Sequence, residues 1–253
     1  MSGIFKSIDW ITMKVDLTTA KILFFDLEYY VQENRRNVKG LKYNPWSGIC
    51  SFIGGGFLSY TPNQSMKIED TAIKSKIDCF LAWNYENERK LVVDIFKYLM
   101  DIFDDVEYGK SKGVYPVLCG IGITHSDVPA LIELAKKHNI FTPEEAFSFQ
   151  SRFRTVDLSV YSIGLFRSNK NFVYPQRKNT ILNKIFPDKK FESGTSVWDL
   201  YENAEYGVIE DRVKSEVTST FCLLRDIRRL YMKHLDSYRE LMNNKGAKFD
   251  KPA

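Results

Sequence analysis

The sequence predicts an α/β protein in which one mixed β-sheet is covered by helices. Residues 20–31, AKILFFDLEYYV, form an apolar and aromatic run that is interrupted only by two acids. Such a run is typical of a strand that is buried on both faces. Apolar runs and amphipathic segments follow it, and residues 209–241 carry a long apolar stripe at helical spacing. Together these observations indicate a central sheet between helices.

Two further strands are expected soon after the first. Residues 48–59, GICSFIGGGFLS, are largely apolar, and their three glycines indicate a bulge or a turn within a hairpin. Residues 79–84 resemble a third, shorter strand. Because these segments follow one another directly, we expect them to be antiparallel neighbours.

The middle of the chain predicts a helix, a strand and a second helix. Residues 87–103 form an amphipathic segment that can cover the sheet, and residues 114–123, VYPVLCGIGI, predict a strand. Ser126 and Asp127, followed by a proline, indicate the start of the next helix. The first helix is identified by four apolar residues at helical spacing: Leu91, Ile95, Leu99 and Phe103.

The last third of the chain combines a basic segment with the long helix. Residues 168–190 are polar and basic with interleaved aromatic side chains, so we expect them to line a substrate groove. We find no internal repeat or linker, and therefore expect a single domain over residues 1–253, with a core at about 20–232 and an extension at each end. The stripe of the long helix consists of Val213, Val217, Phe221, Leu224, Ile227, Tyr231 and Leu235.

Composition limits the classes of protein that remain. The chain has 253 residues with 44% hydrophobic content, which is enough for one substantial core. Its net charge of +4 suits a polyanionic partner without demanding one. The four cysteines stand far apart, which argues against a zinc cluster or a disulfide framework. No run approaches the roughly 20 apolar residues of a membrane span, so we expect a cytoplasmic protein with no membrane partner.

Two acids in the first strand are the strongest chemical signal. Asp26 and Glu28 stand two residues apart, so their side chains emerge on one face while Leu27 points the other way. Burying both as anions would be costly through desolvation and repulsion, and a divalent cation would relieve that cost. The alternative is that both lie at an exposed end of the strand.

Two later acids have ordinary interpretations when each is considered alone. Asp127 stands where a strand passes into a helix, where it could face the edge of the sheet or simply cap the helix. Glu216 lies beside the apolar stripe of the long helix, where it could reach a site or form a solvated pair with Arg212.

The order of these acids resembles the DEDD, or DnaQ-like, 3′-to-5′ exonucleases, especially the branch related to the exonuclease domains of family B polymerases. FFDLEYY resembles the first motif of that family, and PVLCGIGITHSDVPALIELAKKHNI resembles the second, which carries Asp127. RVKSEVTSTFCLLRDI resembles the tyrosine-x-x-x-aspartate helix, with Glu216 at the aspartate position. Residues 156–159 and 180–182 also resemble family landmarks, so the resemblance covers roughly residues 20–232.

The resemblance implies a ribonuclease-H-like fold and a metal-dependent 3′-to-5′ exonuclease. Asp26, Glu28, Asp127 and Glu216 would hold two Mg²⁺ or Mn²⁺ ions about 3.5–4 Å apart, a separation suited to in-line displacement at phosphorus. The substrate would be DNA or RNA with a 3′ end, preferably single-stranded, and the products would be 5′-mononucleotides. Leu27, Tyr29 and His125 are candidate substrate-binding residues, although for His125 an ordinary loop histidine is the favoured interpretation.

Several positions depart from the family pattern. Glu216 replaces an aspartate, and Arg212 stands where this branch carries a tyrosine that orients the attacking water. Asp211 occupies the position of the base in the histidine subgroup, so it is a candidate proton acceptor, but it could also favour the macrodipole at a helix start. In the second motif, Gly122 and Ser126 replace an asparagine or histidine and a phenylalanine.

Two other functions stay open. The departures at Arg212 and Glu216 also fit a non-catalytic nucleic-acid-binding or scaffold protein with the same fold. A metal-dependent endonuclease is a third possible function. The sequence has no HExxH, Walker phosphate loop, GxGxxG or nucleophile elbow, which argues against the corresponding enzyme classes. The choice between DNA and RNA, the pathway, and the oligomeric state, a homo-oligomer included, are left open.

Overall fold

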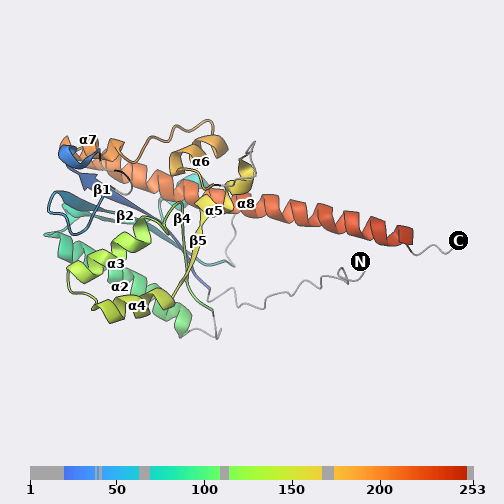
Figure 1. Ribbon diagram of the computed structural model, residues 1–253, viewed down its shortest axis with the longest axis horizontal. Coiled ribbons are helices and arrows are strands. Elements are labelled where there is room, and N and C mark those ends of the chain that lie inside the picture. The colour runs from blue at the N-terminus through green and yellow to red at the C-terminus, as the bar shows by residue number, and fades with distance from the viewer. Residues whose placement is uncertain are drawn as a thin grey trace.

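A computed structural model of the chain describes residues 20–37, 39, 42–62, 69–108, 114–166 and 174–249. It contains a five-stranded sheet with the order β3-β2-β1-β4-β5 (Figure 1). β1 is antiparallel to β2, as is β2 to β3, whereas β4 runs parallel to both β1 and β5. The predicted mixed sheet is therefore confirmed. Its strands are β1 (Ile22–Val31), β2 (Cys50–Tyr60), β3 (Asp78–Leu81), β4 (Val117–Gly120) and β5 (Arg154–Asp157).

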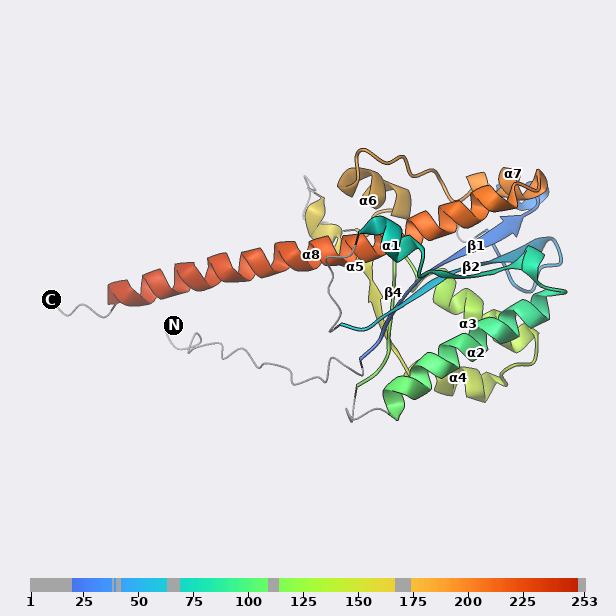
Figure 2. The same cartoon turned by 180° about the vertical axis from the view of Figure 1, so that it is seen from behind.

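Helices cover both faces of this sheet. Figures 1 and 2 show α2, α3 and α4 on one side and α6, α7 and α8 on the other. The helices of the first side are α2 (Glu88–Glu107), α3 (Asp127–Lys137) and α4 (Pro143–Ser151). The remaining α-helices are α1 (Asp70–Lys74), α5 (Leu158–Tyr161), α6 (Lys178–Ile185), α7 (Ser196–Glu202) and α8 (Tyr206–Phe249), and the short 3-10 helices are η1 (Glu33–Arg35), η2 (Ala82–Asn84) and η3 (Ile163–Leu165).

The alternation of side chains along β1 separates two hydrophobic cores. Leu23, Phe25 and Leu27 point into the core that contains α2 and α3. Phe24 points the other way and packs against Phe221 of α8, with ring centroids 5.3 Å apart. Because side chains of a strand alternate between its faces, the even-numbered residues that follow Phe24 also face α8.

The glycine run in β2 bends the strand and admits a close neighbour. The register between β1 and β2 shifts between Glu28 and Tyr29, opposite Gly54, whose φ is 113°. The predicted bulge is thus confirmed. The alternative prediction, a turn inside this segment, is wrong because β2 (Cys50–Tyr60) is one continuous strand. At Gly56, an added Cβ would lie 2.6 Å from Cγ1 of Val213. The absence of a side chain there lets α8 approach the sheet closely.

The long helix α8 extends well beyond the sheet (Figures 1 and 2). Its 44 residues exceed the predicted range at both ends. Val213, Val217 and Phe221 are buried, as their spacing predicts, but Tyr231 is 63% exposed where the helix has left the domain. The side chain of Leu235 lies outside the described residues. Among the helices that the structure describes, none is both long and apolar enough to cross a membrane.

Candidate metal centre

Three buried carboxylates meet between β1 and α8. Asp26 and Glu28 come from the face of β1 that looks toward α8, and Glu216 comes from α8 itself. One oxygen from each of the three lies within 4.8 Å of the others. Their exposed fractions are only 5%, 4% and 3%. The alternative of an exposed strand end for Asp26 and Glu28 is therefore wrong, and residues about 190 positions apart form one acidic group.

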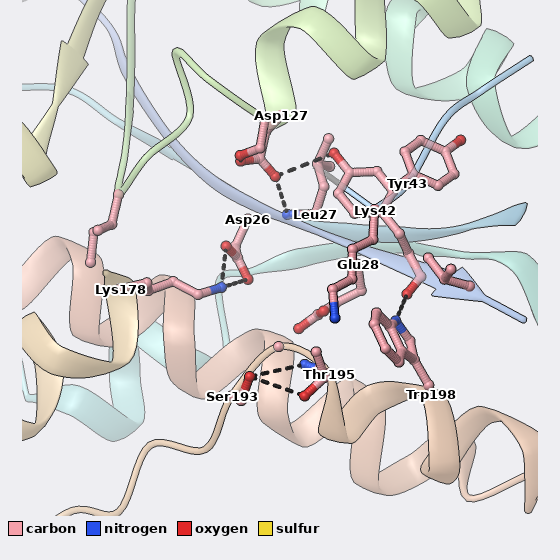
Figure 3. A pocket seen from close by; sticks show the side chains of 15 residues that line it. Asp26, Leu27, Glu28, Lys42, Tyr43, Asp127, Lys178, Ser193, Thr195 and Trp198 are labelled. Carbon is pink, nitrogen blue, oxygen red and sulfur yellow. Dashed lines mark hydrogen bonds and ion pairs between the residues drawn. The ribbon is translucent and has the colours of Figure 1, made fainter. Parts of the chain in front are cut away.

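Asp127 lines the same pocket from the opposite side of β1, although it is not part of the three-carboxylate group (Figure 3). It is the first residue of α3, and Ser126 occupies the N-cap position, so the capping interpretation is wrong. The Asp127 carboxylate instead accepts hydrogen bonds from the backbone N–H of Leu27 at 3.2 Å, the Tyr29 hydroxyl at 3.4 Å and the Ser126 hydroxyl at 2.5 Å. These bonds turn the acid toward the sheet.

Two basic side chains bind the acidic group. Lys178 Nζ lies 2.8 and 3.0 Å from the two oxygens of Asp26 and 2.5 Å from Oε2 of Glu216. Arg212 places Nε 3.1 Å from Oε1 of Glu28 and Nη2 2.8 Å from Oε1 of Glu216. The expected pair between Arg212 and Glu216 thus exists, but it is buried and shared with Glu28 rather than solvated.

One oxygen of the cluster lacks a hydrogen bond. Oε2 of Glu216 is fully buried, and its 2.5 Å ion pair with Lys178 does not have hydrogen-bond geometry. A buried carboxylate oxygen in this state is costly unless another positive group reaches it. The atom therefore depends on the positive charge of Lys178.

The electrostatics of the cluster show a shortage of positive charge. Burial raises the pKa of Asp26 well above its usual range, and repulsion from Glu216 and Glu28 adds to the effect despite Lys178. Burial and Glu216 likewise raise the pKa of Glu28 to about 7. For Glu216, burial also favours the protonated form, but the positive charges of Lys178 and Arg212 outweigh the effect of burial and lower the pKa of Glu216. Lys178 stays protonated because its acidic neighbours raise its pKa in spite of burial.

Asp26, Glu28 and Asp127 line a pocket of about 330 Å³. Its wall is partly aromatic: Tyr29 stacks on Tyr43 with ring centroids 4.1 Å apart, and Trp198 donates a hydrogen bond from Nε1 to the backbone oxygen of Tyr29 at 3.0 Å. Lys42 Nζ lies 5.2 Å from the centre of the Trp198 ring. Residues 193–195, between α6 and α7, add two hydroxyl groups and a glycine to the rim.

Some of the predicted site residues are elsewhere. The side chain of Asp211 is 75% exposed and pairs with Lys74 at 3.0 Å, so its prediction as a base in the site is wrong. Five residues of helix rotate it about 140° from Glu216. The helix-start interpretation also fails, because α8 begins at Tyr206 and Asp211 lies beyond the first turn. His125 is exposed and is not among the residues that line the pocket.

Leu27 and Tyr29 are both at the pocket, but in different ways. The Leu27 side chain packs into the core on the far side of β1, and its backbone N–H holds Asp127. Tyr29 presents its ring to the pocket wall. Tyr29 thus contributes its ring to the pocket wall, whereas Leu27 contributes its backbone, and a substrate contact by either residue stays a prediction.

Several pocket residues were not singled out by the sequence. Lys178 lies within the predicted groove segment 168–190, but nothing distinguishes it there from neighbouring lysines. Lys42, Trp198 and residues 193–195 carry no recognisable motif. Of the groove segment, residues 167–173 lie outside the described part of the chain.

The landmark acid Asp157 has a structural role. Its buried carboxylate accepts hydrogen bonds from the backbone N–H of Gly122 and Thr124, at 2.8 and 3.1 Å, and from the Thr124 hydroxyl at 2.6 Å. It also accepts bonds from the backbone and hydroxyl of Ser159, at 2.9 and 2.7 Å. Although burial alone would raise its pKa, these bonds lower it. They fix the loop that leads into α3 and so help to position Asp127.

No protein-family model matches this chain, and no curated protein matches its sequence. The mixed sheet flanked by helices and the buried group of three acids are compatible with a ribonuclease-H-like fold. The case for function thus depends on the motifs and on the geometry of the pocket.

Proposed function

We propose that this protein is a metal-dependent 3′-to-5′ exonuclease that removes 5′-mononucleotides from DNA or RNA. The observation that carries the proposal is the buried group of Asp26, Glu28 and Glu216, of which Asp26 and Glu28 line one pocket with Asp127. These acids come from three distant segments, in the order of the three exonuclease motifs that the sequence resembles. Burying several acids together costs stability through desolvation and mutual repulsion.

The donor set supports a hard divalent cation. Carboxylate oxygens are the ligands that Mg²⁺ and Mn²⁺ prefer. Asp26, Glu28 and Glu216 would hold the metal, because one oxygen from each lies within 4.8 Å of the others. When bound, such ions make a nucleophile from water at neutral pH and stabilise the charge that develops at phosphorus.

The chain's own residues supply binding and orientation. Tyr29 and Trp198 give the pocket aromatic surfaces on which a base of a single strand can stack. Lys42 and the hydroxyls of Ser193 and Thr195 are cationic and hydrogen-bonding partners for a phosphate. Arg212 holds Glu28 and Glu216 in fixed orientations, so we assign it a positioning role in place of the water-orienting tyrosine.

One observation favours a second candidate function. Lys178 and Arg212 already pair with three of the acids, which would let the pocket fold without metal. A non-catalytic protein that binds single-stranded nucleic acid would have the same features. Digestion experiments separate the two.

The test uses a linear single strand labelled at its 5′ end, incubated with the full chain and Mn²⁺ or Mg²⁺. We expect stepwise shortening from the 3′ end on a denaturing gel, release of 5′-mononucleotides, and no reaction in EDTA. A circular strand of the same sequence should stay intact. Binding without shortening in either metal would instead support the non-catalytic function, and cutting of the circle would indicate an endonuclease. DNA and RNA versions of the strand determine the preferred substrate.

A further inference from the structure

We propose that Lys178 is a built-in cation of the acidic cluster, so that the site takes one divalent ion where the resemblance implies two. The inference rests on the proposed function, since it concerns how the same carboxylates hold metal. It assigns a positioning and charge-balancing role to a residue outside the three exonuclease motifs.

The contacts of Lys178 place its charge at the centre of the cluster. Nζ bridges Asp26 on β1 and Glu216 on α8, at 2.8 and 3.0 Å from the first carboxylate and 2.5 Å from the second. Figure 3 shows the side chain extending from its helix directly to Asp26. A second divalent ion placed at Nζ, between the Asp26 oxygens and Oε2 of Glu216, would occupy the same space as the ammonium group. Lys178 and an ion at that position are therefore mutually exclusive.

The helix that carries Lys178 is firmly packed. Lys178 is the first residue of α6, and Ile181 and Leu182 of that helix are fully buried in the core that includes α8. The side chain of Lys178 is only 24% exposed. The ammonium group is therefore held by the fold, unlike a lysine that samples many positions at the surface.

The charges of the four acids and their two basic partners favour one ion over two. When ionised, the carboxylates of Asp26, Glu28, Asp127 and Glu216 carry four negative charges, and the two bound cations Lys178 and Arg212 cancel half of them. One divalent ion then brings the group to neutrality. Two ions would leave a net charge of two in a buried site, which is costly.

The experiment counts Mn²⁺ ions bound by the full chain, using the electron paramagnetic resonance signal of free Mn²⁺ during titration. We expect one ion per wild-type chain. In Lys178→Met, which keeps the length of the side chain and removes its charge, we expect two. Lys178→Arg keeps the charge and should bind one. Lys184→Met, at an exposed position of the same helix, is the matched control and should also bind one. Circular dichroism melting curves verify that each variant is folded.

The outcomes separate this inference from the proposed function. Two ions in the wild-type chain would overturn the role of Lys178 and leave the exonuclease proposal standing, and this result does not depend on any variant. One ion in wild type and still one in folded Lys178→Met would overturn the role as well. No bound ion in any chain, together with no digestion, would overturn both proposals.

Discussion

Replacement of Asp26 by asparagine is expected to lower the rate of 3′-end digestion by at least about 10³-fold. Asparagine has nearly the same shape as aspartate but no charge, so it weakens the binding of the divalent cation. Stabilisation of the transition state by such a cation is worth several kcal/mol. It also removes the anion that Lys178 contacts at 2.8 Å. The measurement is the initial rate of mononucleotide release from a single strand in saturating Mn²⁺.

Asp101→Asn is the matched control for that experiment. Asp101 lies exposed on α2, on the opposite side of the sheet from the acidic cluster, and should keep the wild-type rate. Equal digestion by wild type and by folded Asp26→Asn would remove the acidic cluster from the reaction. A parallel loss in Asp101→Asn would point to a general effect on folding.

Replacement of Gly54 by alanine is expected to destabilise the fold by about 3 kcal/mol or more. The φ of 113° at Gly54 is one that side-chain-bearing residues rarely adopt, and an added Cβ would lie 1.9 Å from the backbone oxygen of Phe80. Relief of this clash would separate β2 from β3 and disturb the register beside Glu28. For a chain of this size we expect the melting temperature to fall by roughly 6–12 °C, measured by circular dichroism.

Gly48→Ala provides the comparison for the bulge. An added Cβ at Gly48 meets no atom within 4 Å, so this variant should melt within about 2 °C of wild type. If Gly54→Ala melted at the wild-type temperature, the positive φ and the tight contact with β3 would both be contradicted.

Most of the fold could be predicted from hydrophobic patterns. The first strand is a nearly continuous apolar run and the long helix has strong periodicity, which is why both were predicted to within a few residues at their N-terminal ends. The predicted strand at residues 114–123 was too long, because the structure keeps only Val117–Gly120 in the sheet. Residues after Gly120 form the loop that Asp157 holds, and those bonds involve residues far away in sequence.

The acids of the site were predictable because two of them interrupt an apolar strand. Lys178 was not, since its role depends on contacts with Asp26 and Glu216, which lie 152 and 38 residues away along the chain. Asp211 was misplaced because its position was taken from the resemblance without regard to its direction on the helix. A rotation of about 140° from Glu216 sends it to the surface.

The central claim is that Asp26, Glu28 and Glu216 together hold a divalent cation. Crystals of the full chain soaked in Mn²⁺, with anomalous diffraction collected near the manganese edge, test it most directly. The account predicts an anomalous peak at about 2.0–2.3 Å from oxygens of these carboxylates, and Lys178 still in contact with Asp26. A saturating soak with no peak at this cluster, in crystals where other acidic sites bind Mn²⁺, would contradict it.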